Sequence, residues 1–231
     1  TQSYAFGVSA DGNTVVGRGN LAVGFEAVRW RAGVLVGLGD LAGGPHESTA
    51  YGASADGSVI VGTARDASVG RGVRWDDTAM TQLPQFAGHG GYSECQGVSS
   101  DGQTLCGFNS NGTVTGYGSV IAVRIDAGVM TGLPYTPVST MGYDSGCYLQ
   151  PSEDGRVLSG RVRLSGIDYQ ACCWVDTTLT LLPQLPGGQT YSQCFSISGD
   201  GSVQVGVSCS SASPFQLQGE ACRWENGAAL S

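Results

Sequence analysis

Three kinds of residue in this 231-residue chain could carry chemistry: a repeated aspartate, two histidines and eight cysteines. The aspartate stands before a glycine in the phrase "SADGNTVVG" at 9–17, where it could be a ligand or a catalytic acid. Related phrases return along the chain, and their aspartates are Asp11, Asp56, Asp101, Asp154 and Asp200. Because an enzyme rarely needs five copies of one acid, we interpret these residues as corners of hairpins, in which Gly, and less readily Asp, accepts a positive φ.

The histidines offer little support for catalysis. A nucleophilic serine or cysteine needs a base beside it, and only His46 and His89 are available. Both lie in connections between repeats, where a histidine is more often simply exposed to solvent. The sequence contains no "GxSxG" elbow, phosphate loop or dinucleotide fingerprint. We therefore predict no catalytic residue, no metal and no cofactor.

The cysteines all lie from residue 95 onward and include no CxxC pair. Their number favours an exported protein with disulfides, although buried thiols remain the alternative. The candidates are Cys95, Cys106, Cys147, Cys172, Cys173, Cys194, Cys209 and Cys222. We favour short-range bridges within repeats, and the clearest is Cys95–Cys106, which flanks the Asp101 turn. Cys209 and Cys222 compete for Cys194, and Cys147 and Cys172 occupy the first and third expected strands of the fourth repeat.

The charge of the chain argues against some classes of binding partner. The formal net charge is −8 and the pI is about 4.5, which argue against nucleic acid or an anionic membrane surface as partner. We find no apolar run long enough to span a bilayer, and no signal peptide at Thr1. We expect an extracellular or cell-surface bacterial protein in a mature form.

The repeats share the same order of short sequence motifs, and this order positions these residues. After each Asp-Gly phrase comes a second phrase such as "EAVRW", and after most of these a third such as "GLGDLAGG". Each unit reads as four short strands bounded by Gly and Pro. A period of about 46 residues with four antiparallel strands predicts an all-β fold, a five-repeat β-propeller in a single domain. The expected repeats are 1–45, 46–90, 91–141, 142–189 and 190–231.

The third strand of each unit carries the second repeated group. Its arginines are Arg29, Arg74, Arg124 and Arg223, and its tryptophans are Trp30, Trp75, Trp174 and Trp224. Because neighbours on a strand face opposite ways, we expect each Trp to fill the core between blades. Each Arg then pairs with a carboxylate or with loop carbonyls, the turn aspartate being one candidate, or else is solvated at a blade edge.

This order of motifs resembles that of the HAF-type bacterial extracellular repeat proteins. The matching segments are Gly7–Gly17, Glu26–Trp30 and Leu38–Gly44 in order, with further matches at Gly52–Gly62 and Glu220–Trp224. The resemblance covers the whole chain and implies an exported or surface-associated β-propeller. It implies little about activity, because a repeat defines the family. The fourth unit departs most, with Glu153 before the aspartate and Cys173 in place of the arginine.

A ligand face is expected opposite the Asp-Gly turns, where the loops between second and third strands join the connections between units. Four tyrosines are expected just before the first strands: Tyr51, Tyr92, Tyr143 and Tyr191. Together with His46 and His89 they form the candidate ligand face, and the tyrosines could stack on sugars. Ordinary packing at a strand entrance is the alternative.

Two classes of function fit these observations best. The first is a non-catalytic binding or adhesion module for a glycan or another extracellular component. The second is a structural subunit of a filament or surface layer, in which chain ends stack on other copies because exposed blade faces are liabilities. A closed five-bladed ring fits the repeat count equally well. A hydrolase or lyase is the third option and lacks a residue constellation.

Overall fold

The computed structural model describes residues 2–21, 24–112, 120–134, 145–147, 151–165, 168–187, 191–209 and 219–231. These residues form five antiparallel sheets of four strands each, and in every sheet the strands are hydrogen-bonded in chain order. Each predicted repeat contains one of the sheets. The all-β prediction is therefore confirmed.

The strands are short and follow one another without helices in the described part of the chain. The first two sheets contain β1 (Ser3–Val8), β2 (Thr14–Leu21), β3 (Gly24–Arg31), β4 (Val34–Gly37), β5 (Ser48–Ala53), β6 (Val59–Arg65), β7 (Gly70–Asp76) and β8 (Ala79–Gln82). The third contains β9 (Ser93–Val98), β10 (Thr104–Ser110), β11 (Val120–Asp126) and β12 (Val129–Gly132). The last two contain β13 (Ser145–Cys147), β14 (Val157–Ser165), β15 (Asp168–Val175), β16 (Thr178–Leu181), β17 (Ser192–Ile197), β18 (Val203–Ser208), β19 (Glu220–Glu225) and β20 (Ala228–Leu230).

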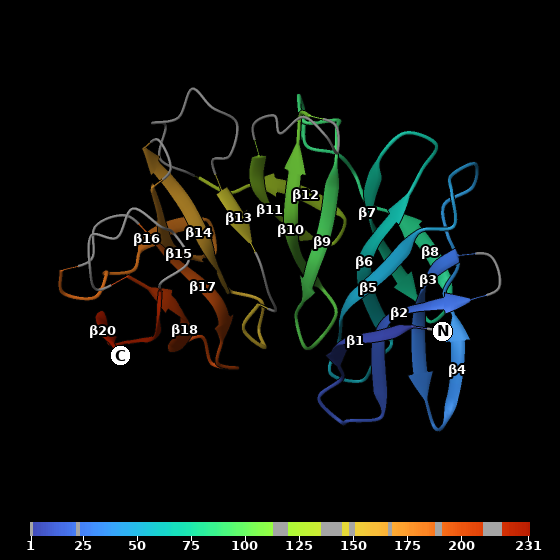
Figure 1. The fold of residues 1–231 in the computed structure, drawn as a ribbon, viewed down its shortest axis with the longest axis horizontal. Coiled ribbons are helices and arrows are strands. Elements are labelled where there is room, and N and C mark those ends of the chain that lie inside the picture. Colours follow the sequence, from blue (N-terminus) through green and yellow to red (C-terminus); the bar gives the residue numbers. More distant parts are fainter. Residues whose placement is uncertain are drawn as a thin grey trace.

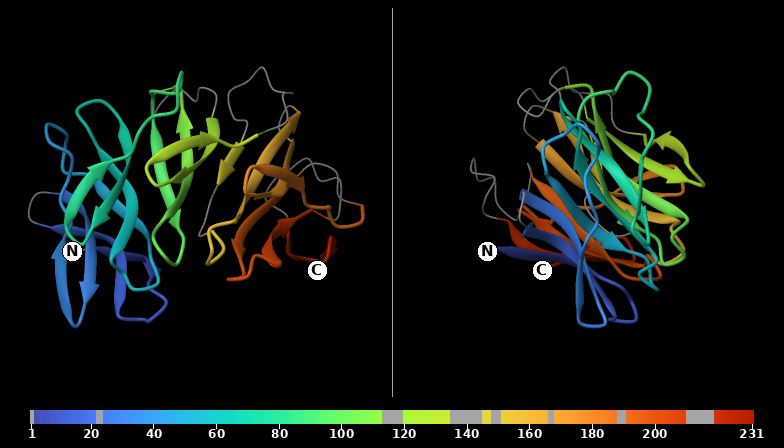
Figure 2. Two further views of the ribbon diagram at one scale, coloured as in Figure 1. Left: turned by 180° about the vertical axis from the view of Figure 1, so that it is seen from behind. Right: turned by 90° about the vertical axis from the view of Figure 1, so that its right-hand side faces the viewer.

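The five sheets, or blades, follow one another along an arc (Figure 1). The view from behind shows the same order, with the first and last blades at opposite ends (Figure 2, left). Extensive contacts between described strands of different sheets join only consecutive blades. β5 contacts both β1 and β9, so the first strands line the inner edge of this part of the arc. We call the side of a blade that faces the preceding blade its rear face, and the other side its front face.

The repeated aspartate closes the turn between the first and second strands of each blade. In the second blade, the Gly57 N–H donates to the Ser54 carbonyl at 2.9 Å. The Ser54 hydroxyl donates to Asp56 Oδ1 at 2.7 Å and accepts from the Val59 N–H at 3.0 Å, and Asp56 Oδ1 also accepts from the Ser58 N–H at 2.9 Å. The turn glycines have φ between 68° and 75°, whereas no turn aspartate has a positive φ. The aspartate therefore acts through its carboxylate, and only the glycine supplies the left-handed backbone.

In four blades a glycine on the second strand makes room for a bulge in the first strand. A Cβ built on Gly62 would lie 2.0 Å from the Thr49 carbonyl oxygen, and the same overlap, at 1.9–2.0 Å, exists at Gly17, Gly107 and Gly206. The first strand shifts register at this level in blades one, two, three and five. In these four blades the glycine that ends the "VVG"-type motif is thus required by the close approach of two backbones.

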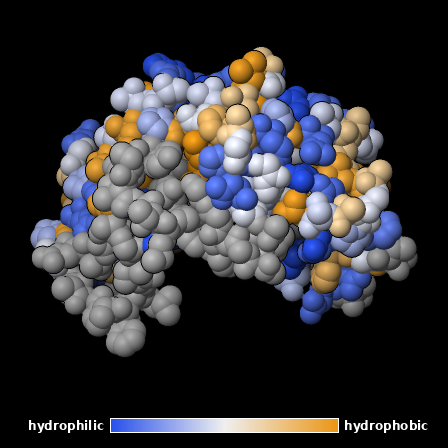
Figure 3. All heavy atoms as spheres, turned by 90° about the horizontal axis from the view of Figure 1, so that it is seen from above, coloured by the Kyte–Doolittle hydropathy of each residue, from blue (hydrophilic) through white to orange (hydrophobic). Residues whose placement is uncertain are grey.

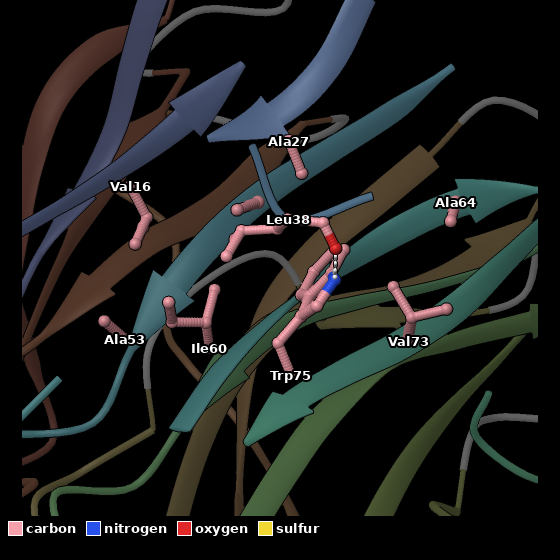
Figure 4. Packing of buried hydrophobic residues seen from close by; sticks show 9 residues of the cluster. Val16, Ala27, Leu38, Ala53, Ile60, Ala64, Val73 and Trp75 are labelled. Carbon is pink, nitrogen blue, oxygen red and sulfur yellow. Dashed lines mark hydrogen bonds between the residues drawn. The ribbon is translucent and has the colours of Figure 1, made fainter. Parts of the chain in front are cut away.

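The hydrophobic core is divided into four clusters, one between each pair of consecutive blades. Between the first two blades, Trp75 packs with Val16, Ala27 and Ile60 and donates its indole N–H to the Leu38 carbonyl at 2.8 Å (Figure 4). This arrangement follows from strand alternation, because every strand is covered on both faces when a blade has two neighbours.

Candidate functional site

The candidate site lies on the inner strands of the second and third blades. Tyr51 is within β5, and Tyr92 comes directly before β9, which carries Glu94 and Gln96. All four side chains are partly buried. We call these four residues the inner polar cluster.

Glu94 is the centre of the inner polar cluster. Its carboxyl group accepts hydrogen bonds from the Tyr92 hydroxyl and from Gln96 Nε2, the latter at 2.8 Å. Tyr51 of the neighbouring blade interacts electrostatically with the same carboxyl group. Burial raises the pKa of Glu94 above 4.5, its ordinary value, although these hydrogen bonds act in the opposite direction. Burial, and then the neighbouring Glu94, raises the pKa values of Tyr51 and Tyr92, so both phenols stay protonated at neutral pH.

Aromatic rings extend the cluster along the inner edge. The Phe6 and Tyr51 rings lie 5.8 Å apart between blades one and two, and Tyr92 and Phe108 lie 6.0 Å apart within blade three. The Arg18 guanidinium lies 5.0 Å from the ring centre of Tyr4. Tilted aromatic rings and a cation beside hydrogen-bonding groups suit a polar ligand that also has apolar faces.

One acceptor in the cluster is unused. Gln96 Oε1 is buried and has no hydrogen-bond partner within the described part of the chain. A buried polar atom usually has a partner, and this oxygen has almost no accessible surface, so it meets an external donor only after the Gln96 side chain turns. The cluster thus offers hydrogen-bonding groups and aromatic rings to a ligand.

A related arrangement occurs in blades four and five, on β14, β15 and the start of β17. The Tyr191 hydroxyl donates to Gln193 Oε1 at 2.8 Å, as Tyr92 donates to Glu94 at the equivalent positions of blade three. Arg161 Nη1 donates to the same Gln193 oxygen at 2.8 Å, and its guanidinium lies 4.3 Å from the ring centre of Tyr169. Two of the predicted tyrosines therefore recur in one role.

The remaining predicted ligand residues are not brought into one site. Tyr143 lies outside the described residues. His46 is exposed, with Nδ1 3.7 Å from Asp40 Oδ2, and the His89 ring is 5.8 Å from Phe86. No group of three His, Cys, Asp or Glu side chains that could hold a metal ion occurs among the described residues.

The repeated arginines pair with carboxylates other than the turn aspartates. Arg74 Nη2 is 2.7 Å from Asp76 Oδ1, and its Nη1 donates to the Gly102 carbonyl of the next blade at 2.9 Å. Arg124 makes the same two kinds of bond, to Asp126 and Gly155. Arg29 pairs with Asp77 of the next blade, and Arg223 with Glu225. These bonds hold the guanidinium groups across blade boundaries in the first three blades.

The expectation that every repeated tryptophan is buried is wrong for Trp30. Trp75, Trp174 and Trp224 have at most 1% of their surface exposed, but Trp30 is 54% exposed. The reason is its place in the fold, because the third strand directs the Trp toward the preceding blade. The first blade has no blade packed on its rear face in this structure (Figure 1).

The predicted Cys95–Cys106 bridge is also wrong. Cys95 lies in the core cluster between blades two and three, and Cys106 in the cluster between blades three and four. Gly107, not Cys106, is the cross-strand partner of Cys95, so the two side chains leave opposite faces of the sheet. The first-strand bulge causes this shift, which sequence spacing does not reveal.

The other short-range bridges fail on distance. Gly206 lies between Cys194 and Cys222, and Gly160 between Cys147 and Cys172, so each pair is two strands apart. Two strand spacings are about 9.5 Å, beyond the reach of a disulfide of about 7 Å. Cys194 and Cys209 are not cross-strand neighbours either, because Cys194 pairs with Gly206, which lies three residues before Cys209.

The seven cysteines whose side chains are described form no disulfide with one another, and the Cys147 side chain lies outside the described residues. Cys173 is buried in the core between blades four and five. Burial raises the pKa of Cys194 to about 11, so this thiol stays protonated at neutral pH.

Sequence reasoning missed a serine on the first strand. The Ser48 hydroxyl accepts from the Ala27 N–H of the preceding blade at 2.8 Å, and Ser93 and Ser192 accept from Gly72 and Ala171 at 3.0 and 2.9 Å. The signal was present, because a serine stands eight residues before the turn aspartate in four of the five repeats.

Comparison with known proteins bears on the fold. TolB from Acinetobacter baumannii superposes with a TM-score of 0.61 at 15% identity, covering 98% of this chain and 52% of that one. The β-propeller domain of the Trilobed protease from Pyrococcus furiosus gives 0.52 at 10% identity, covering 100% and 71%. Prolyl oligopeptidase B from Galerina marginata gives 0.57 at 9%, covering 96% and 32%. The chain folds as a β-propeller.

This β-propeller spans about half the length of the Acinetobacter TolB that it resembles. No protein-family profile matches it, and neither does any curated protein. Within the described residues there is no helix long and apolar enough to cross a membrane.

Proposed function

We propose that this β-propeller is a non-catalytic binding module at a bacterial cell surface or in the extracellular medium, and that its ligand is a carbohydrate. The inner polar cluster carries the proposal. Tyr51 and Tyr92 offer rings for stacking, while Glu94 and Gln96 offer hydrogen-bonding groups to hydroxyls. Gln96 Oε1 has no partner in the described part of the chain, and it becomes an acceptor for a ligand hydroxyl once its side chain turns to the surface. The proposed surface location rests on the resemblance of the repeat motifs to those of the HAF-type proteins.

The direct test is a glycan array followed by titration calorimetry on the best hit. Tyr92→Phe keeps the ring and removes the hydroxyl, and Gln96→Leu removes the amide. Each change should weaken binding about tenfold, which corresponds to one net hydrogen bond. Gln103→Ala is the matched control, because Gln103 is exposed on the Asp101 turn at the other end of β9. Equal affinity for all four proteins, or no glycan bound, would reject the proposal.

The second candidate is a structural subunit that joins end to end with other copies. It is favoured by the exposed rear face of the first blade, where Trp30 has no blade to cover it. Electron microscopy of the purified protein as a function of concentration tests this role. Filaments or sheets are expected, and single particles at every concentration would contradict it.

A further inference from the structure

Figure 3 shows the molecule from above, where hydrophilic and hydrophobic residues mix among the coloured atoms without one large apolar area. The more unusual feature lies in the inner polar cluster, at the boundary of blades two and three. In the described part of the chain the Gln96 amide makes one hydrogen bond, from Nε2 to Glu94 Oε2 at 2.8 Å, and its Oε1 is buried without a partner. A buried acceptor usually has a donor, so its place beside Glu94 needs a physical reason.

The hydrogen bonds of Glu94 fit the ionised form of its carboxyl group. Oε1 accepts from the Tyr92 hydroxyl, and Oε2 accepts from Gln96 Nε2. Both oxygens act as acceptors, as expected for a carboxylate. A neutral carboxyl group has an O–H donor as well, and this donor needs an acceptor within reach.

Gln96 Oε1 is the acceptor that a neutral Glu94 needs. The oxygen and nitrogen of an amide have nearly the same shape, so a half-turn about the last side-chain bond exchanges their positions. Oε1 would then stand where Nε2 stands now, 2.8 Å from Glu94 Oε2, a distance that suits an O–H···O hydrogen bond. The turn breaks no second hydrogen bond among the described residues, because Oε1 has no partner there.

Gln85 shows the opposite case. Its Oε1 accepts from Arg71 Nη1 and its Nε2 donates to Ser93 Oγ, both at 2.9 Å. Turning this amide would set Nε2 against the arginine donor, which keeps its charge at every relevant pH. The orientation of Gln85 is therefore fixed, whereas that of Gln96 depends on the proton of Glu94.

The surroundings of Glu94 favour uptake of this proton in mild acid. Burial raises the pKa of Glu94 above its ordinary value of 4.5, and its hydrogen-bond donors oppose this shift. The titratable groups that act on the carboxyl in the described part of the chain are the phenols of Tyr92, beside β9, and Tyr51, on β5. The charged groups around these phenols are Glu47, which acts on Tyr92 and pairs with Arg65, and Arg18 of β2, which acts on Tyr51.

We propose that Glu94 and Gln96 form a proton switch, in which protonated Glu94 turns the Gln96 amide over and the inner polar cluster holds its ligand less tightly. This regulation rests on the carbohydrate binding proposed above. Ionised Glu94 makes charge-assisted hydrogen bonds to ligand hydroxyls, and these are about twice as strong as bonds to a neutral group. Affinity should therefore fall about tenfold as pH drops through the midpoint of Glu94.

The first test needs no ligand. The NMR signals of the Glu94 carboxyl carbon and of the Gln96 side-chain NH2 group are followed from neutral to acid pH. Both should move with one midpoint above 4.5, because one proton changes both groups. The Gln85 NH2 signals are the internal control, and they should not follow this midpoint.

Glu94→Gln imitates the neutral carboxyl group, because its amide offers an acceptor to Tyr92 and a donor to Gln96. In this variant the Gln96 NH2 signals should keep their acid position at every pH. Glycan affinity, measured by titration calorimetry, should fall about tenfold in acid for the wild type and stay at the low value for the variant. Gln103→Ala is the matched control and should keep the pH dependence of the wild type, because Gln103 is exposed at the other end of β9.

Gln96 signals that do not follow the titration of Glu94, or that keep their neutral position in Glu94→Gln, would overturn the switch. Equal glycan affinity in acid and at neutral pH would overturn its effect on binding. If no glycan binds at any pH, the proposed function and its regulation fail together, while the NMR titration still decides whether the proton turns Gln96.

Discussion

Trp30 and Trp75 occupy the same position in consecutive blades and differ only in whether a blade covers them. Trp75→Ala should lower the free energy of unfolding by about 3–5 kcal/mol, because it removes a buried indole and its hydrogen bond to Leu38. Trp30→Ala should cost less than about 1 kcal/mol in the monomer. Urea denaturation at a dilute, monomeric concentration compares the two. Similar losses would mean that the rear face of blade one is already covered.

Glu94 should give the protein a pH-dependent stability. Its pKa is raised in the folded state, so the folded protein binds this proton more tightly than the unfolded chain does. The stability contribution is therefore complete below about pH 4.5 and is lost as pH rises through the folded-state pKa. Glu94→Gln should flatten this part of the profile of melting temperature against pH. Parallel profiles for the two proteins would contradict the assignment.

The turn aspartates should also make stability depend on pH, but in acid and in the opposite direction to Glu94, because their pKa values are lowered in the folded state. Hydrogen bonds from the Ser58 amide and the Ser54 hydroxyl lower the pKa of Asp56 from 3.8 to about 2, and equivalent bonds lower that of Asp200 to about 2. Their contribution is present above pH 4 and is lost as pH falls toward 2. Asp56→Asn should be less sensitive to acid in this window. An unchanged acid midpoint would show that the carboxylate does not stabilise the turn.

At the scale of the strand, replacing the second-strand glycine by alanine should lower the free energy of unfolding more than replacing a loop glycine. Gly62→Ala places a Cβ against the Thr49 carbonyl, so either the bulge or the pairing of β5 with β6 must shift, at a cost of about 1–3 kcal/mol. Gly90→Ala is the control, because nothing lies within 4 Å of its added Cβ. Thermal denaturation ranks the two. Equal melting temperatures would mean that the bulge relaxes freely.

At the scale of the whole molecule, the blades should open from the ends, because the extensive contacts between described strands of different blades join consecutive blades. Trp224→Ala weakens the core cluster between blades four and five. Hydrogen exchange should therefore accelerate in β17–β20 while β5–β8 keep their protection. Uniform acceleration in all five blades would instead indicate one cooperative unit.

The repeated phrases by themselves determined the all-β class, five four-stranded units, the turn at each Asp-Gly pair and a tryptophan facing the core, because these depend on strand period and local backbone preference. The tertiary structure decided the rest. It exposed Trp30, separated Cys95 from Cys106 and joined Tyr51 to Glu94, whose contact crosses a blade boundary. Sequence spacing does not encode a bulge or an open end, since both depend on which backbones and blades meet in space.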